Sequence, residues 1–337
     1  NDLSHWVTSS GGSTNHTNIP SINDDVYFDA NSFSSTGQTV SISGSVADCK
    51  SMDWTGVTND PTFNIGNQLS IYGSLTFVPN MTVSASSKIY FKSTSNGNTI
   101  TMSENSVDDI DFDSDGGEWT IQDSLSCGNF IIKRGSLNTN NQPLKTGHFQ
   151  IRNTAGVVNL YSSNIYVYGY SVSLNTSLLD VGTSTFHVKG NYWQGADFNY
   201  FSNNLHNVIL DLIGDFRLIG QGLCNKILVK CSGTKISGVS TDTLIVSAGK
   251  TLQLDGTVTV NDYLEMNGTC SLLSNLTGTG TLSSATGNIV VNHTNIENVT
   301  ATGGASFVAN DSYDLGGNIG WTINSTSAKD YYWVGGG

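Results

Sequence analysis

Charged residues, cysteine and proline are all scarce in this chain. Only 12% of its 337 residues are charged, with 14 basic against 27 acidic side chains, about half of the usual share for a soluble protein. The five cysteines form no CxxC pair, which argues against a structural zinc site. The net charge of −13 comes with no basic stripe, so we expect no nucleic-acid partner.

Long apolar runs and helical periodicity are missing as well. No run approaches the roughly 18 residues of a membrane-spanning helix, so we expect no membrane insertion. Good helix formers are sparse, and Gly, Asn, Ser and Thr recur every few residues, which disfavours helices. No signal peptide opens the sequence, so an export signal would have to lie outside this segment.

Short strand patterns fill the chain instead. Runs of three to six β-branched or aromatic residues, bounded by Gly, Asn or Ser, recur throughout, as in residues 69–72 and 88–91. These runs predict an all-β fold. Two architectures fit, a right-handed parallel β-helix (a β-solenoid) and stacked β-sandwiches. The scarcity of hairpin signals and the lack of a linker favour the solenoid.

A solenoid fold predicts the length and spacing of the coils and the division of the chain. Coils of roughly 20 to 25 residues would give about 13 coils, stacked at the strand spacing of about 4.8 Å. Ser, Thr and Asn at the bends would hydrogen-bond along the stack. We expect an N-terminal joint or cap over residues 1–30, a solenoid body over 31–320, and an aromatic, glycine-rich joint over 321–337.

The two ends of the sequence read as halves of one motif. The chain finishes Tyr-Tyr-Trp-Val-Gly-Gly-Gly and begins Asn-Asp-Leu-Ser-His-Trp. Terminal aromatics gain nothing unless something covers them. We interpret the chain as one period of a tandem array whose copies meet head to tail; a disordered tail is the alternative. The predicted joint comprises Asp2, His5, Trp6, Tyr331, Tyr332 and Trp333.

Several phrases of the sequence carry a family resemblance. They are DDVYFDANSF at 24–33, MDWTG at 52–56, IYGSLTF at 71–77, GGEWT at 116–120, and DLGGN followed by GWT at 314–322. Together with the two ends, they resemble tandem-repeat modules of giant secreted bacterial surface proteins, adhesin-like and often exported by the type IX route. The likeness covers residues 1–137 and the C-terminal part, but the middle poorly. Family members usually carry a short stretch between the glycines and the Asp, whereas here Gly337 would join Asn1 directly.

This resemblance implies a location and a role. It implies an extracellular or cell-surface protein with an adhesive or filament-forming function, and it supplies no catalytic residues. We therefore expect a structural repeat module of an extracellular fibre or giant surface adhesin, with further copies of itself as partners. The alternative is a carbohydrate-active or glycan-binding β-helix, such as a tail-spike-like depolymerase or an adhesin domain.

The densest acidic cluster spans residues 108–118. In a strand, Asp109, Asp111, Asp113 and Asp115 would share one face, and four unpaired carboxylates there would call for a cation or for solvent. The run Asp-x-Asp-x-Asp-Gly from 111 to 116 begins like a calcium loop, but its twelfth position is Gln122, not Glu. Calcium is the one possible cofactor, and a solvated acidic face is the alternative.

Two further patterns bear on function. The acidic strand could supply the paired carboxylates of a glycosidase, and Lys133 and Arg134 are the nearest candidates for the base of a lyase. Since no HxH, HExxH or GxSxG motif occurs, we expect no enzyme. A set of aromatic residues would suit glycan stacking or, alternatively, packing in the core or between copies. This set comprises Tyr166, Tyr168, Tyr170 and Trp193.

Overall fold

The computed structural model describes residues 3–42, 44, 46–152, 156–174, 178–191, 196–199, 204–213 and 216–326. Of residues 170, 171, 190, 191, 196, 197, 212 and 213 it describes the backbone only. Within this part the chain is all-β, with parallel strands stacked as a β-solenoid of about 12 turns, as the sequence predicts. The named strand pairs run parallel, which rules out stacked sandwiches because these are built from antiparallel sheets.

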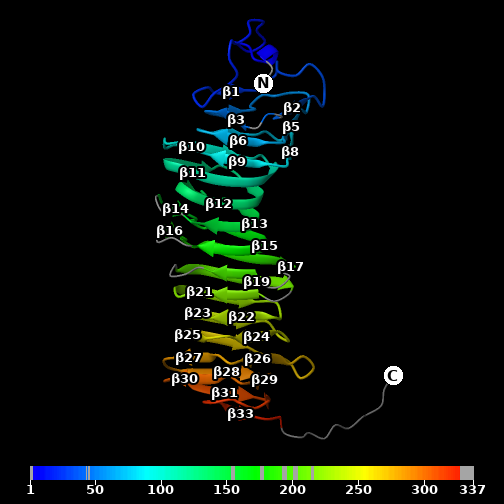
Figure 1. Cartoon of the computed structure of the whole chain (residues 1–337). Coiled ribbons are helices and arrows are strands. Elements are labelled where there is room, and N and C mark those ends of the chain that lie inside the picture. Colours follow the sequence, from blue (N-terminus) through cyan, green and yellow to red (C-terminus); the bar gives the residue numbers. More distant parts are fainter. Residues whose placement is uncertain are drawn as a thin grey trace, which may run out of the picture. The chain divides into compact units, whose positions relative to one another are not determined.

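The chain divides into two compact units, Asn1–Asn191 with Asp197–His206, and Tyr192–Ala196 with Asn207–Gly337. Figure 1 shows strands of successive coils lying side by side within each of them. The described helix content is a single 3₁₀ turn, η1 (Leu3–His5). No described helix has the length and apolar character needed to cross a membrane.

The first unit contains β1 (Val26–Tyr27), β2 (Thr39–Ser41), β3 (Val46–Cys49), β4 (Met52–Asp53), β5 (Thr62–Ile65), β6 (Gln68–Ile71), β7 (Leu75–Thr76), β8 (Thr82–Ala85), β9 (Lys88–Phe91), β10 (Asn98–Thr101), β11 (Ser106–Ile121), β12 (Leu125–Asn138), β13 (Leu144–Ile151), β14 (Val158–Asn159), β15 (Asn164–Leu174), β16 (Leu179–Asp180) and β17 (Thr185–Asn191). β18 (Ala196–Asn199) and β19 (Leu205–Ile213) contain residues of both units.

Each early coil of this unit has three faces. One face stacks β2, β5 and β8, the next β3, β6 and β9, and the third β1, β4, β7 and β10. From β11 onward, long strands run through more than one face. Val26 lies opposite Met52, whereas Trp119 lies opposite Leu137, so the length of a coil in this unit varies from 26 to 18 residues.

The second unit contains β20 (Phe216–Ile219), β21 (Leu223–Val229), β22 (Thr234–Ser237), β23 (Val239–Val246), β24 (Thr251–Leu254), β25 (Thr257–Met266), β26 (Ser274–Gly278), β27 (Thr281–Ser284), β28 (Asn288–Asn292), β29 (Thr294–Glu297), β30 (Thr300–Gly303), β31 (Ser306–Asn310), β32 (Tyr313–Asp314) and β33 (Thr322–Asn324). One face stacks β20, β22, β24, β26, β29 and β32. Another face is closed by β28, β31 and β33.

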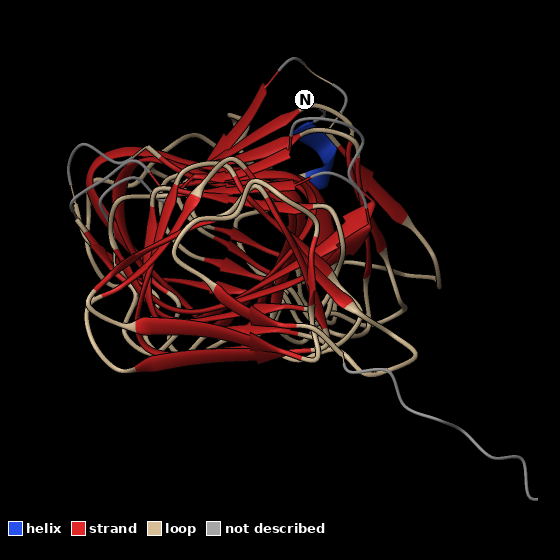
Figure 2. Ribbon diagram, turned by 90° about the horizontal axis from the view of Figure 1, so that it is seen from below, coloured by secondary structure: helices blue, strands red, loops and turns tan. Residues whose placement is uncertain are grey.

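The core is a stack of apolar side chains inside the coils. Alternate residues of each strand point inward, as in β12, where buried and half-buried positions alternate. Seen from below, the strands surround this interior (Figure 2). A phenylalanine ladder runs along it in the first unit, from Phe91 through Phe112, Phe130 and Phe149 to Phe186, with ring centroids 5.0 to 5.8 Å apart. Such ring pairs add to the stabilisation from burial itself.

Polar side chains at the bends tie one coil to the next, as the sequence predicts. The side-chain amide of Asn59 donates to the carbonyl of Phe33 at 2.6 Å, and that of Asn80 to Val57 at 2.7 Å. In the second unit, Asn295 donates to the side chain of Asn275 at 2.8 Å. These bonds satisfy groups that would otherwise be unpaired at the corners.

Candidate functional site

In the described part of the chain, the strands that begin the three faces of the solenoid each pair on one side only. β1 covers β4 through the pairs Val26–Met52 and Tyr27–Asp53. Among the described residues, β2 pairs with β5 alone and β3 with β6 alone. An edge of this kind presents unpaired N–H and C=O groups and is a template for another strand. Among the described residues, each of the three faces therefore ends in an edge strand, which is β1, β2 or β3.

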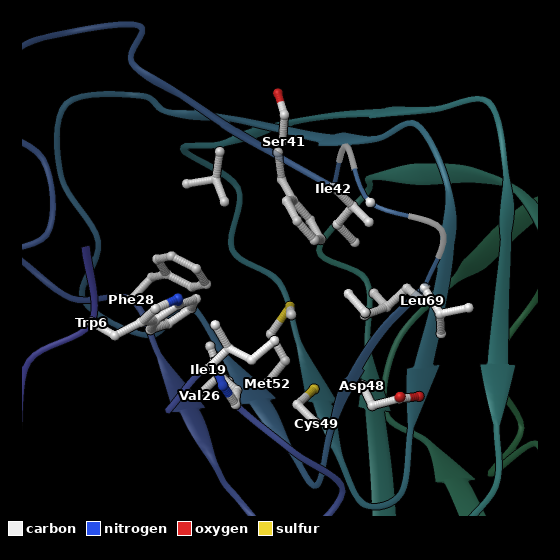
Figure 3. A pocket seen from close by; sticks show the side chains of 16 residues that line it. Trp6, Ile19, Val26, Phe28, Ser41, Ile42, Asp48, Cys49, Met52 and Leu69 are labelled. Atoms are coloured by element: carbon white, nitrogen blue, oxygen red, sulfur yellow. The ribbon is translucent and has the colours of Figure 1, made fainter. Parts of the chain in front are cut away.

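A pocket of about 170 Å³, which we call the mouth pocket, opens at this end of the first unit. Figure 3 shows Met52 and Cys49 near its base, Trp6 beside Phe28 at one side and Leu69 at the other. Most of the other side chains in its wall are apolar: Ile19, Pro20, Val26, Val40, Ile42, Val46, Ala47 and Phe63. Ser41 and Asp48 are the polar side chains that line it. The pocket thus lies at the end of the hydrophobic core, where the segment before β1 contributes Trp6, Ile19 and Pro20 to its wall.

An aromatic cluster borders the mouth pocket. The ring of Phe28 stacks on that of Trp54 at 3.9 Å, and Trp6 lies against Phe28 at 6.1 Å with the planes tilted by 59°. Phe33 stacks on both Phe28 and Trp54, and the ring of Phe63 in turn contacts that of Trp54. Because Trp54 is fully buried while Trp6 is only half-buried, the cluster leads from the core to the pocket rim.

Two of the six predicted joint residues are described. Trp6 belongs to the pocket, and His5 ends the 3₁₀ turn η1, exposed to solvent. The N-terminal segment, blue in Figure 1, holds Trp6 in place because the carbonyl of Trp6 accepts a hydrogen bond from the amide of His16. Asp2, Tyr331, Tyr332 and Trp333 lie outside the described residues.

Cys49 places a thiol group in the wall of the pocket. Its side chain is 2% exposed, and burial, followed by the charges of Asp48 and Asp25, raises the pKa of the thiol to about 12. A thiol with so high a pKa is protonated and unreactive at neutral pH. Cys49 therefore acts as a small apolar side chain.

The predicted acidic face is paired with cations from neighbouring coils. Asp109 and Asp111 point outward from β11, since Ile110 between them is fully buried. The carboxylate of Asp111 lies 3.1 Å from Nζ of Lys88 on the preceding coil and 2.7 Å from Nζ of Lys133 on the following one. Lys88 also approaches Asp109, at 3.6 Å. Asp111 has no exposed surface, so these ammonium groups replace the water that it has lost.

Arg134 neutralises the other half of the acidic run. Its guanidinium contacts Asp113 at 2.7 Å and Asp115 at 2.8 Å, and the hydrogen bond and charge of Asp113 raise the pKa of the arginine. Within the described part, no group of three or more His, Cys, Asp or Glu side chains is placed to hold a metal ion. Calcium stays a prediction, and it would have to displace these lysine and arginine contacts.

Tyr90 lies at the centre of the same outer face. The ammonium groups of Lys88, Lys92 and Lys133 lie 5.8, 5.1 and 5.6 Å from the centroid of its ring, within the range of cation–π attraction. Burial opposes the charge of Lys88, but the hydrogen bond and charge of Asp111 outweigh it, so the pKa of Lys88 is raised. Lys88 is therefore a charged partner of Asp111.

The predicted aromatic stripe is present in part. Tyr166 and Tyr168 lie on the outer face of β15 with ring planes 15° apart, and Tyr166 stacks on His187 at 4.5 Å. Lys189 lies 5.7 Å above the Tyr166 ring, and Tyr168 is 50% exposed. The side chain of Tyr170 and the whole of Trp193 lie outside the described residues.

Some of these features have no counterpart in the sequence analysis. The mouth pocket combines residues from Trp6 to Leu69, and Lys88 was not among the predicted site residues. The signal for the mouth pocket is the open strand edge that is expected at any end of a solenoid. The signal for Lys88 is the run 88–91, in which lysine and tyrosine alternate with core residues.

Comparison with known proteins gives no relative: no family model, no curated protein and no solved structure matches this chain. The fold therefore defines the class. The chain is a β-solenoid protein, with a pocket at its first coil and ion pairs that link adjacent coils on one outer face.

Proposed function

We propose that this chain is a structural repeat module of an extracellular fibre or giant surface adhesin, whose copies dock head to tail. The observation that carries the proposal is the first coil, with strands β2 and β3 open at their edges above an apolar pocket. A stacked array buries such an edge, and each added copy contributes a nearest-neighbour interface to stability. The function is mechanical: backbone ladders carry load, and the joints transmit it.

Thermal unfolding of a two-copy fusion tests this proposal. In one fusion Gly337 is followed directly by Asn1 of a second copy, and in the control a long Gly/Ser linker separates the copies. A docked joint raises the midpoint of the direct fusion above that of the single chain and of the linker control. Equal midpoints for all three proteins would remove the support for a stacking module.

The exposed aromatic stripe favours a second candidate, glycan binding. Tyr166 and Tyr168 stand nearly parallel on the outside of β15, and the apolar face of a sugar stacks on rings of this kind. Tyr168→Ala should weaken binding to an immobilised polysaccharide panel, whereas Tyr263→Ala, which removes a ring of similar exposure (51% against 50%), should not. Equal binding by both variants argues against the stripe, and product release from the panel would establish an enzyme instead.

A further inference from the structure

We infer that the mouth pocket is the acceptor site for the aromatic segment 331–333 of a second copy, which adds as a strand beside β3 and places Trp333 in the pocket. The inference rests on the proposed stacking function and deepens it by naming the two surfaces that meet. It combines three features: an apolar pocket, an open strand edge beside it, and a segment with the matching chemistry.

The pocket is suited to an aromatic side chain. Its volume of about 170 Å³ is of the order of one large ring system. Its wall is built mainly from aliphatic and aromatic groups with Cys49 and Met52 at the base, and Ser41 and Asp48 add polar groups. Apolar side chains at the rim remain accessible, with Ile19 42% and Val46 42% exposed. Filling the pocket would bury this surface, and such burial contributes about 25 cal/mol for each Å².

The backbone beside the pocket is suited to an extended segment. β3 pairs on one side with β6, from Val46–Gln68 to Cys49–Ile71, and no described strand occupies its other side. In strand addition, main-chain hydrogen bonds provide affinity and pockets for alternate side chains provide specificity. A strand laid beside β3 would place every second side chain over the interior of the coil, where the mouth pocket lies.

The segment Tyr331-Tyr332-Trp333-Val334 has the required pattern. In a strand, the side chains of Tyr331 and Trp333 point to one side and that of Tyr332 to the other. Trp333 can therefore enter the pocket while Tyr331, on the same side, stays at the rim. The described tryptophans have other places: Trp54 and Trp119 are buried, Trp321 packs on Phe307, and Trp6 borders the pocket. The segment is thus an aromatic ligand that the chain itself carries.

Chain connectivity permits this contact in a tandem array. If Asn1 of the next copy follows Gly337, Trp333 precedes Trp6 of that copy by ten residues, a reach of up to roughly 35 Å when extended. Trp6 itself lines the pocket. The short tether gives the segment a high effective concentration at the neighbouring pocket, so a modest affinity in solution is enough in the array.

Sedimentation velocity of the full single chain over a range of concentrations measures the contact in solution. We expect concentration-dependent association that weakens at least tenfold in Val46→Asp and in Trp333→Ala. Val157→Asp is the matched control, because it introduces the same charge at a valine of similar exposure (44% against 42%) on a later coil; it should stay within twofold of wild type. Circular dichroism and thermal midpoints establish that both valine variants are folded.

A fluorescent peptide of residues 327–337 provides a second measurement. The peptide should bind saturably to the chain that carries Trp333→Ala. Adding Val46→Asp to this chain should abolish binding of the peptide, whereas adding Val157→Asp should preserve it. Equal binding by the two valine variants would overturn the assignment of the pocket. A Trp333→Ala chain that loses thermal stability independently of concentration would overturn it too, because the segment would then occupy its own chain.

The two proposals fail in different ways. If the direct fusion is stabilised but Val46→Asp has no effect on it, the stacking function stands and the mouth pocket is not its joint. If the direct fusion has the same thermal midpoint as the linker control, the proposed stacking function is wrong, whether or not the peptide binds.

Discussion

The carboxylate of Asp111, buried in the outer face of its coil, lies 2.7 Å from the ammonium group of Lys133 on the next coil. Lys88 on the preceding coil completes the arrangement at 3.1 Å. One carboxylate thus links three successive coils in the direction of stacking. The two ion pairs of Asp111 thus link the coils through side chains, in addition to the backbone hydrogen bonds of the ladder.

Removing this link should destabilise the first unit more than an exposed ion pair would. We expect Asp111→Ala to lower the free energy of unfolding by about 2 kcal/mol, because two partly buried ammonium groups lose their partner. Asp115→Ala is the control: the Asp115 side chain is 74% exposed, and such pairs contribute at most about 1 kcal/mol. Urea denaturation followed by circular dichroism measures both, and equal losses would contradict a special role for Asp111.

Three buried thiols predict an alkaline loss of stability. Burial is the main cause that raises the pKa values of Cys49, Cys127 and Cys224 to about 12 from an ordinary value of 9.0. Between these values the unfolded chain loses thiol protons that the folded chain keeps. The unfolded state then binds fewer protons, so stability falls as the pH rises from about 9 to 12, by about 1.4 kcal/mol per pH unit for each thiol.

Urea titrations at pH 7 and at pH 10.5 test this dependence. Cys127→Ala should lose stability at both pH values but show a shallower decline between them, since one titrating thiol is gone. Cys270→Ala should decline as the wild type does, because the side chain of Cys270 is exposed in the folded protein. A Cys127→Ala decline as steep as that of the wild type would show that its thiol does not contribute.

The sequence predicts the fold better than it predicts the site, for a physical reason. Alternation of apolar and polar residues is local, so strand runs such as 88–91 can be recognised one at a time, and polar bends such as Asn80 mark the corners. Contacts between coils depend on the coil length, which ranges from 14 residues at Val308–Thr322 to 26 at Val26–Met52. No fixed spacing therefore identifies the pair Lys88–Asp111.

The acidic run illustrates the same limit. Its residues 109, 111 and 113 do point outward, as the alternation predicts, and Lys133 and Arg134 do lie beside them. Both are engaged in ion pairs with the carboxylates, and the role of a lyase base stays a prediction. The mouth pocket could not be predicted for another reason: it combines residues between Trp6 and Leu69 that come from several strands and from the segment before them, and no local pattern marks such a combination.

The phenylalanine ladder should be the most sensitive part of the core in the first unit. Phe130 contacts Phe112 and Phe149, both at 5.5 Å, and it has no exposed surface. Phe130→Ala should cost about 3 to 5 kcal/mol because a cavity opens between two coils. Phe130→Leu, which keeps most of the volume, should cost less than half as much. A loss for Phe130→Ala as small as that for Phe130→Leu would mean that the neighbouring rings collapse into the space.

A column of glycines should prove as important as the aromatic core. Gly128, Gly147 and Gly169 lie on successive coils inside β12, β13 and β15, where the register of β13 and β15 shifts and the chain turns a corner within the strand. A Cβ added to Gly169 would lie 2.2 Å from the carbonyl oxygen of Gly147. Backbone cannot move aside as a flexible side chain can, so Gly169→Ala should force the coils apart and cost more than about 2 kcal/mol.

Gly66→Ala is the matched control for this bend. Its added Cβ would lie 3.3 Å from the carbonyl oxygen of Ile42, a contact that a shift of a few tenths of an ångström relieves. We expect a change of less than about 1 kcal/mol there, with part of any loss offset because alanine restricts the unfolded chain. Hydrogen exchange of the amides around β13 and β15 distinguishes the two cases. Faster exchange confined to Gly169→Ala would show that close backbone approach at the corner, rather than glycine content as such, holds these coils in register. Unchanged exchange in both variants would mean that the bend can open without disturbing the ladder.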